Sequence, residues 1–381
     1  MLQEFITILS SSETAKLVYA PEGMPALDLS GKSTSFFEFW PSWLMYLPVG
    51  VLWLLLAIRY RSLSLPLIAN PGIPLSGMVG VPKSSVFDLA GVEAREWILP
   101  WLVYQVSDAP ITEQCQIVQG LIEAAGLQLP IVGKPDIGCR GTGVQLIKNS
   151  VELEQYLRQF PLTGAIQFQR LADWDAEVGV FYVRYPEQAG GEITSMTLKY
   201  TPYVLGDGER SLGELVESDP RAGELAHLYK IRHAKNWDKV LASGEPYRLV
   251  FSASHCRGAI FRDAETLITG ELCQKLDAIF DDISEFYYGR LDIKFRDVES
   301  LCKGEKFAII EINGASSESI SIWDRNTGFF EAVGTLMQQY RTLFKLGQAN
   351  RKRGYNPPGL AALYKAWRYE ANLTINYPEN D

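Results

Sequence analysis

Three oxygen-bearing side chains lie on two strand-like segments and could together hold a divalent cation. In residues 289–295 polar and apolar residues alternate, which places Asp292 on a polar face opposite the apolar side chains. Residues 308–314 alternate in the same way and place Glu311 and Asn313 on one polar face. Carboxylate and amide oxygens are the ligands that magnesium and calcium prefer in proteins.

The segment between these two strands decides whether the three side chains meet. Residues 296–306 are polar and contain Lys303-Gly304-Glu305, which is typical of a hairpin connection. The two strands are therefore predicted to be antiparallel neighbours with their polar faces together. A surface hairpin whose polar side faces water is the alternative interpretation.

A glycine-rich loop follows a short apolar strand that ends at Lys134. Its backbone could approach a phosphate closely, and its N–H groups could point at that phosphate. Lys134 would supply a point charge, and Arg140 could reach from the tip of the loop. The Gly-x-x-x-x-Gly-Lys-Ser/Thr pattern of a P-loop is absent, and a plain hairpin turn is the alternative. The loop glycines are Gly138, Gly141 and Gly143.

Taken in order, these motifs resemble those of the ATP-grasp superfamily, in particular D-alanine–D-alanine ligases and other carboxylate–amine ligases. The motifs are Gly-Lys134-Pro before a glycine loop, Gly-Arg290-x-Asp292 on one strand and Glu311-x-Asn313 on the next. The segment 202–216 is similar to a stretch of cyanophycin synthetases, although Ser211 and Glu214 also form a good helix capping box. The resemblance covers about residues 125–345.

The resemblance implies an α+β architecture, an ATP-grasp fold in which two α+β lobes clamp ATP behind a small α/β preface domain and an apolar N-terminal helix. The expected units are residues 1–64 (segment with the apolar helix), 65–128 (preface), 129–345 (ATP-grasp domain, with a small ATP lobe at 129–170 and a metal and substrate lobe at 171–345) and 346–381 (basic tail).

The resemblance also assigns roles to single residues. Asp292, Glu311 and Asn313 match magnesium ligands that bridge the ATP phosphates, with one or two ions and with Mn²⁺ as a substitute. Arg290 matches an arginine that touches the transferred phosphoryl group. The matches to nucleotide-binding positions are Lys134 and Lys199 (phosphates), Gly138, Arg140, Gly141 and Gly143 (the phosphate-covering loop), Gln169 (adenine, where the family's usual acid is replaced) and Glu177 (ribose).

Two further groups could serve the substrates. If residues 254–258 form a strand, His255 and Arg257 face the same way. Arg257 could then clamp an acyl phosphate or carboxylate, and His255 could act as a general base toward an amine or be purely structural. After the second strand, Ser317 and Glu318 occupy a loop that helps to bind the acceptor in D-alanine ligases, but the family's residues are not kept here.

An uncharged, apolar run covers residues 40–58 and is followed at once by Arg59 and Arg61. It is borderline for spanning a hydrocarbon core of roughly 30 Å. The interpretations are a helix in the membrane interface, a buried core helix and a true span. If the run inserts, the two arginines keep the following domain on the cytoplasmic side, so we expect a cytoplasmic protein, attached to the inner membrane face in that case.

The amino-acid composition excludes several classes of protein. The 381 residues, 47% of them hydrophobic, describe a folded protein of two or three lobes. The net charge of −9 argues against nucleic acid as a partner. Five scattered cysteines without CxxC spacing indicate a reducing compartment and no zinc ribbon.

The expected function is an ATP- and Mg²⁺-dependent ligase that joins a small-molecule carboxylate to an amine through an acyl phosphate and releases ADP and phosphate. The alternatives are a kinase that uses the same scaffold to phosphorylate a hydroxyl, and a membrane-attached nucleotide-binding module without turnover. A lipid-like or membrane-presented substrate follows only if the apolar run is exposed.

Overall fold

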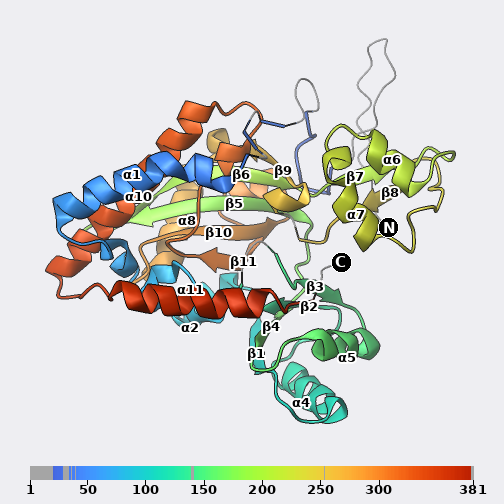
Figure 1. Cartoon of the computed structure of the whole chain (residues 1–381), viewed down its shortest axis with the longest axis horizontal. Coiled ribbons are helices and arrows are strands. Elements are labelled where there is room, and N and C mark those ends of the chain that lie inside the picture. The colour runs from blue at the N-terminus through green and yellow to red at the C-terminus, as the bar shows by residue number, and fades with distance from the viewer. Residues whose placement is uncertain are drawn as a thin grey trace.

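Two antiparallel sheets, one in each lobe, form the frame of the protein (Figure 1). The computed structural model describes residues 20–28, 34–35, 37–38, 40–138, 141–252 and 254–378. The small lobe has the strand order β1-β4-β2-β3 and two covering helices: β1 (Trp101–Gln105), α4 (Ile111–Ala124), β2 (Ile131–Pro135), β3 (Gln145–Ile147), α5 (Ser150–Gln159) and β4 (Ala165–Arg170). Residues 101–127, assigned from the sequence to the preface, therefore add a strand and a helix to this lobe.

The large lobe is built on a five-stranded sheet of order β11-β10-β5-β6-β9. Its strands are β5 (Ala176–Arg184), β6 (Gly191–Tyr200), β9 (Ile260–Asp263), β10 (Tyr288–Phe295) and β11 (Phe307–Asn313). Helix α8 (Gly270–Asp281) packs on one face, where the Tyr182 and Phe280 rings stack 4.2 Å apart. Helix α10 (Phe329–Lys352) covers part of the other face, where Leu343 packs near Phe181. The sheet is therefore covered by α8 on one face and by α10 on part of the other.

The second face of this sheet changes character along its strands. At one end Phe181, Val183 and Tyr288 are apolar and contact the α10 side. Further along the same face, β10 aligns Asp292 with Gly179 of β5 and Lys294 with Glu177. Since side chains two residues apart share a face, one strand pair supplies both a core and a polar wall.

The expected hairpin is confirmed. Strands β10 and β11 are antiparallel, with Asp292 opposite Glu311 and Arg290 opposite Asn313. The connection includes a short helix, α9 (Val298–Cys302), whose N-cap Asp297 accepts a hydrogen bond from Ser300 N.

A small subdomain projects beyond the large sheet, as Figure 1 shows at the upper right. It contains β7 (Tyr203–Leu205), α6 (Leu212–Ser218), α7 (Ala226–Arg232) and β8 (Pro246–Arg248) around its own apolar core. Ser211 and Glu214 form the predicted capping box at the start of α6.

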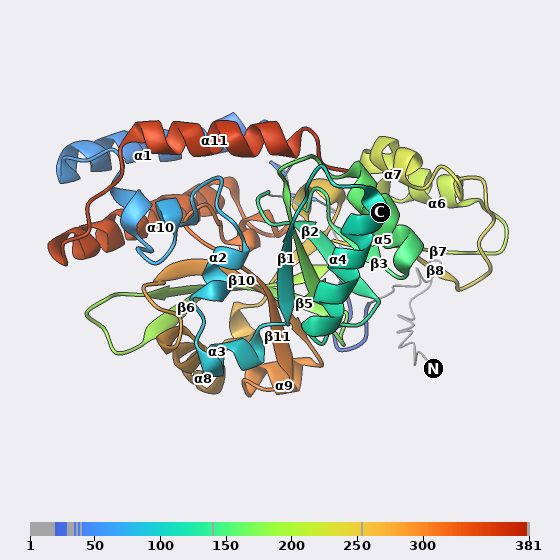
Figure 2. The same cartoon turned by 90° about the horizontal axis from the view of Figure 1, so that it is seen from below.

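The N-terminal and C-terminal helices run along the outside (Figure 2). Helix α1 (Ser42–Tyr60) packs against α10 through Met45 and Val49, and Ala57 lies beside Phe344. Helix α11 (Leu360–Thr374) lies within the C-terminal segment, and Leu373 and Tyr377 join the small-lobe core. The chain therefore returns to the small lobe after completing the large one.

The buried side chain of Asn70 anchors the loop that precedes residue 84 to the large sheet. Asn70 Oδ1 accepts hydrogen bonds from the backbone N–H groups of Tyr287 and Tyr288, at 2.8 and 2.9 Å. Its Nδ2 donates to the carbonyl of Tyr288 at 2.8 Å. Buried polar groups of this kind are costly when left unpaired, so Asn70 anchors the loop that leads to the short helices α2 (Ser84–Asp88) and α3 (Val92–Trp97).

Candidate active site

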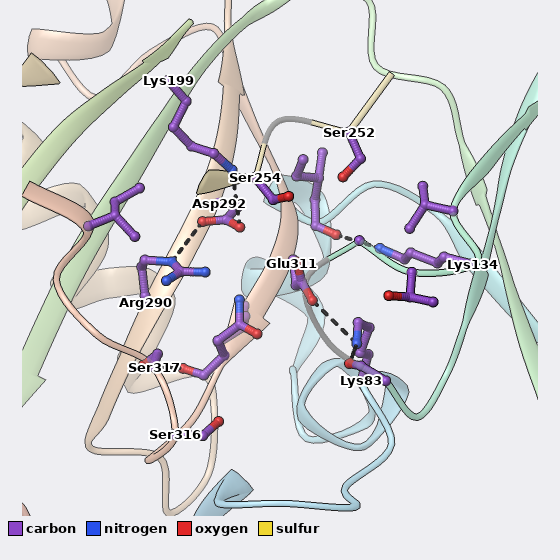
Figure 3. A pocket seen from close by; sticks show the side chains of 18 of the residues that line it. Lys83, Lys134, Lys199, Ser252, Ser254, Arg290, Asp292, Glu311, Ser316 and Ser317 are labelled. Carbon is purple, nitrogen blue, oxygen red and sulfur yellow. Dashed lines mark hydrogen bonds and ion pairs between the residues drawn. The ribbon is translucent and has the colours of Figure 1, made fainter. Parts of the chain in front are cut away.

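The polar wall of the large sheet faces the small lobe across a cavity of about 730 Å³. Strand β2 contributes Lys134, strands β10 and β11 contribute Asp292 and Glu311, and the loop after β11 contributes Ser316 and Ser317 (Figure 3). Segments far apart in the sequence therefore converge on one cleft, as the resemblance implies.

The predicted metal ligands lie together. The β10–β11 register puts Asp292 and Glu311 directly opposite each other, with Asn313 two residues beyond on the same strand. The Nδ2 atom of Asn313 is buried and has no hydrogen-bond partner. Two carboxylates and one side-chain amide oxygen, all on residues that line the cavity, are of the ligand type that Mg²⁺ prefers. Within the described ranges no cluster of three or more His, Cys, Asp or Glu side chains forms a metal site.

Cations surround these acids. Arg290 Nε donates to Asp292 Oδ1 at 3.0 Å, on the same face of the same strand. Lys199 Nζ lies 3.4 Å from Asp292 Oδ2 and also forms an ion pair with Glu177. Lys294 Nζ lies 2.9 Å from the other Glu177 oxygen.

Glu177 therefore sits between two ammonium groups. Burial acts to raise the pKa of its carboxyl, but Lys199 and Lys294 outweigh burial and lower the pKa to about 2. Both of its oxygens are engaged by lysines, which positions those lysines along the cleft. Ribose binding by Glu177 stays a prediction.

Lys134 is buried where the two lobes meet. Its Nζ donates to Gln169 Oε1 and to the carbonyl of Ile310, each at 2.9 Å. Burial lowers the pKa of Lys134 to about 8. Gln169 lines the cavity and donates to the carbonyl of Leu99 at 3.2 Å, and its contact with adenine stays a prediction.

The glycine loop requires glycine at its described positions. Gly141 and Gly143 have φ of +70° and +73°, the left-handed region that disfavours other residues. A Cβ at Gly143 would lie 2.6 Å from Cγ of Pro135. Gly138 and Gly141 line the cavity, and Gly143 lies between two lining residues, Thr142 and Val144. Arg140 lies outside the described residues.

Residues 254–258 do not form the strand on which the shared face of His255 and Arg257 was conditional. His255–Arg257 form a single 3-10 turn, so the reasoning that both side chains share a strand face does not hold. The turn is tethered to the subdomain, where the Tyr229 hydroxyl donates to the carbonyl of Arg257 at 2.8 Å. Ser254 and Cys256 line the cavity, while Arg257 lies beside the glycine loop near Gly141.

Sequence reasoning missed Lys83. Its Nζ lies 3.5 Å from Glu311 Oε1 and donates to the carbonyl of Gly138. Lys83 therefore links strand β11 to the glycine loop. Burial acts to raise the pKa of Glu311, but Lys83 and Lys134 outweigh it and lower that pKa. Lys83 follows a proline- and glycine-rich loop without any charge pattern, so no local signal marks it. Lys294, in contrast, shares the alternating face of Asp292.

The protein was compared with known protein families, curated proteins and solved structures, and it is similar only to solved structures. No family model matches the chain, and no curated protein matches it. The structure is similar to the bifunctional glutathione synthetase from Pasteurella multocida (14% identity, 69% of this chain and 36% of that chain, TM-score 0.35). It is also similar to the D-alanine–D-alanine ligase from Bacillus anthracis (12% identity, 74% and 72%, TM-score 0.39) and the VanG D-Ala:D-Ser ligase from Enterococcus faecalis (11% identity, 71% and 62%, TM-score 0.37).

These structures belong to the class that the sequence resembles, the ATP-grasp carboxylate–amine ligases. The chain spans 36% of the length of the glutathione synthetase that it matches. Such low identities and TM-scores assign no activity to this chain, whose function follows from its own residues.

The lowered pKa of Lys134 predicts a pH dependence of nucleotide binding. As pH rises through about 8, Lys134 in the free protein loses its proton and no longer offers a charge to phosphate. The affinity for MgATP should therefore fall between about pH 7 and about pH 9, measured by calorimetry. In Lys134→Arg the guanidinium stays charged, so this fall should be absent. The same pH dependence in both proteins would contradict the role of Lys134.

Proposed function

We propose that the protein is an ATP- and Mg²⁺-dependent ligase that joins a carboxylate to an amine through an acyl phosphate. One observation carries the proposal: Asp292 and Glu311 face each other across β10–β11 in a cleft shared with basic side chains from both lobes. Those side chains are Lys83, Lys134, Lys199 and Arg290.

The chemistry requires activation because a carboxylate is a poor electrophile for an amine at neutral pH. A carboxylate oxygen attacks the γ-phosphorus of ATP, the bond to the ADP oxygen breaks, and an acyl phosphate forms. The amine nitrogen then attacks the acyl carbon, the bond to the phosphate oxygen breaks, and phosphate leaves with the electron pair. A proton leaves the nitrogen at this step.

The chain's own residues would position and neutralise the charges. Lys134 and Lys83 lie where the nucleotide phosphates would enter from the small lobe, and Arg290 lies beside the acids that face the moving phosphoryl group. Mg²⁺ held by Asp292, Glu311 and Asn313 would neutralise phosphate charge. The glycine loop would cover the phosphates and exclude water from the acyl phosphate.

Hydroxylamine trapping separates a ligase from a kinase, because an acyl phosphate yields a hydroxamate and the phosphate ester formed by a kinase does not. With MgATP and pools of amino acids, amines and fatty acids, we expect ADP, phosphate and a hydroxamate. Asp292→Asn should lower this activity by about 100-fold or more, because it removes charge that holds the ion.

The matched control is Asp238→Asn, an exposed residue of the subdomain, which should retain full activity. Release of AMP and pyrophosphate would rule out the acyl phosphate. Full activity of Asp292→Asn would remove the metal assignment.

We further propose that helix α1 rests on the surface of an anionic membrane. It is the one helix within the described residues that is long and apolar enough to cross a membrane. Only 22% of its apolar stretch Trp43–Tyr60 is buried, although the helix packs along α10. One face presents large apolar side chains that are 54–75% exposed, and Arg59 and Arg61 follow at its end. These side chains are Trp43, Leu47, Val51, Leu54, Leu55 and Ile58. An apolar face with adjacent basic residues suits the interface of a cytoplasmic membrane leaflet.

Vesicle binding tests this placement. The protein should co-sediment with phosphatidylcholine vesicles that contain phosphatidylserine. The double variant Leu47→Glu/Leu54→Glu should weaken binding at least about tenfold, because it removes two exposed leucines that the membrane would bury. The control Val92→Glu/Ile231→Glu changes two exposed apolar residues elsewhere and should bind normally. Equal binding by both double variants would contradict the proposal.

A further inference from the structure

The cavity extends beyond the metal acids into an aromatic part around Glu318. The start of α1 and the loop after β11 meet there, although they lie about 270 residues apart in the sequence. Beside Glu318, this part is lined by Trp40, Met45, Tyr46, Phe261, Ile320 and Trp323. A mostly apolar pocket with a small number of placed polar groups, here Glu318 and the neighbouring Arg290, is typical of a site that orients a small molecule.

Two neutral donors hold the Glu318 carboxylate. Trp323 Nε1 donates to Oε1 at 2.9 Å, and the Tyr46 hydroxyl donates to Oε2. Both donors come from rigid aromatic side chains, so the carboxylate has a defined orientation. Each carboxylate oxygen has a further lone pair with which it can accept another hydrogen bond.

Glu318 differs in charge balance from the other acids of the cleft. Asp292, Glu177 and Glu311 each form an ion pair with a lysine or arginine. Among the residues that the structure describes, no such ion pair is formed by Glu318. The neighbouring Arg290 donates to the backbone carbonyl of Glu318, at 3.2 Å, and directs its Nε to Asp292.

We propose that Glu318 binds the ammonium group of the amine substrate, whose apolar body packs on the aromatic walls. The proposal rests on the ligase function and names its acceptor class: a primary amine with an apolar or aromatic body. A cation gains both from a partly buried carboxylate and from adjacent aromatic rings. A carboxylate substrate would be repelled here and is directed to the side of Arg290 and Lys199.

The position of this subsite suits the second half of the reaction. Arg290 bonds both to the Glu318 backbone and to the Asp292 side chain, so one side chain separates the ammonium subsite from the metal acids. An ammonium held at Glu318 would lie beside the place where the acyl phosphate forms. Transfer of one of its protons to the Glu318 carboxylate would leave a neutral nitrogen with the lone pair that attacks the acyl carbon. Tyr46 belongs to α1 and Trp40 precedes it, so this helix lines the pocket with one face, and its exposed outer face is the one proposed to meet the membrane.

Direct binding to the whole protein tests the proposal without turnover. Calorimetry should show binding of phenethylamine and hexylamine, and at least about tenfold weaker binding of 3-phenylpropanoate, a matched anion. Glu318→Gln should weaken amine binding at least about tenfold, while Glu318→Asp, which keeps the charge, should restore part of it. Glu123→Gln, an exposed residue on α4, is the matched control.

MgATP binding by the same proteins shows whether each variant is folded. Loss of amine binding in Glu318→Gln with MgATP binding retained supports the subsite. Equal affinity for phenethylamine and 3-phenylpropanoate, or unchanged amine binding in Glu318→Gln, would overturn it. If MgATP gives no hydroxamate with any substrate, the ligase function fails, whereas the amine-binding result stands by itself.

Discussion

The buried carboxylates of the large sheet must be neutralised, and this requirement shapes the cleft. Glu177 and Asp292 are both nearly inaccessible to water, and an isolated buried charge is very costly. Lys199 joins the two acids, and Lys294 and Arg290 complete the network. Removing one partner of such a network would cost about 3–5 kcal/mol, because the remaining charge is left uncompensated. The arrangement of three neighbouring strands therefore depends on this one set of ion pairs.

Along its strands, the large sheet has one part that belongs to the core and another that carries the polar side chains of the cleft. Under α10 the face is apolar and contributes to the core, and only a few residues further on the same face carries the acids. A polar wall attached to a rigid core holds its side chains with little freedom, which binding of a triphosphate and a metal requires. The small lobe then brings Lys134, and the preceding segment brings Lys83, to the opposite side of the cleft.

Much of this site was predictable because it is local in sequence. Period-two alternation placed Asp292, Glu311 and Asn313 on one face, and the hairpin connection made them neighbours. The pairing of Glu177 with Lys294, and the position of Lys83, depend on contacts between segments more than 100 residues apart, which no local pattern encodes. The strand on which the shared face of His255 and Arg257 was conditional does not form, because a short polar stretch does not distinguish a strand from a 3-10 turn. The sequence placed Glu318 in a loop that could line an acceptor pocket, but its aromatic partner Tyr46 comes from a helix whose apolar sequence suggested only burial or a membrane.

The central claim is that Asp292 and Glu311 hold a divalent ion against the phosphates of ATP. The most direct measurement is anomalous scattering from a crystal of the protein with Mn²⁺ and a non-hydrolysable ATP analogue. The account predicts a manganese peak in contact with both carboxylates and with phosphate oxygens, and Lys134 beside the nucleotide. A nucleotide bound elsewhere, or an ion that contacts neither acid, would contradict it.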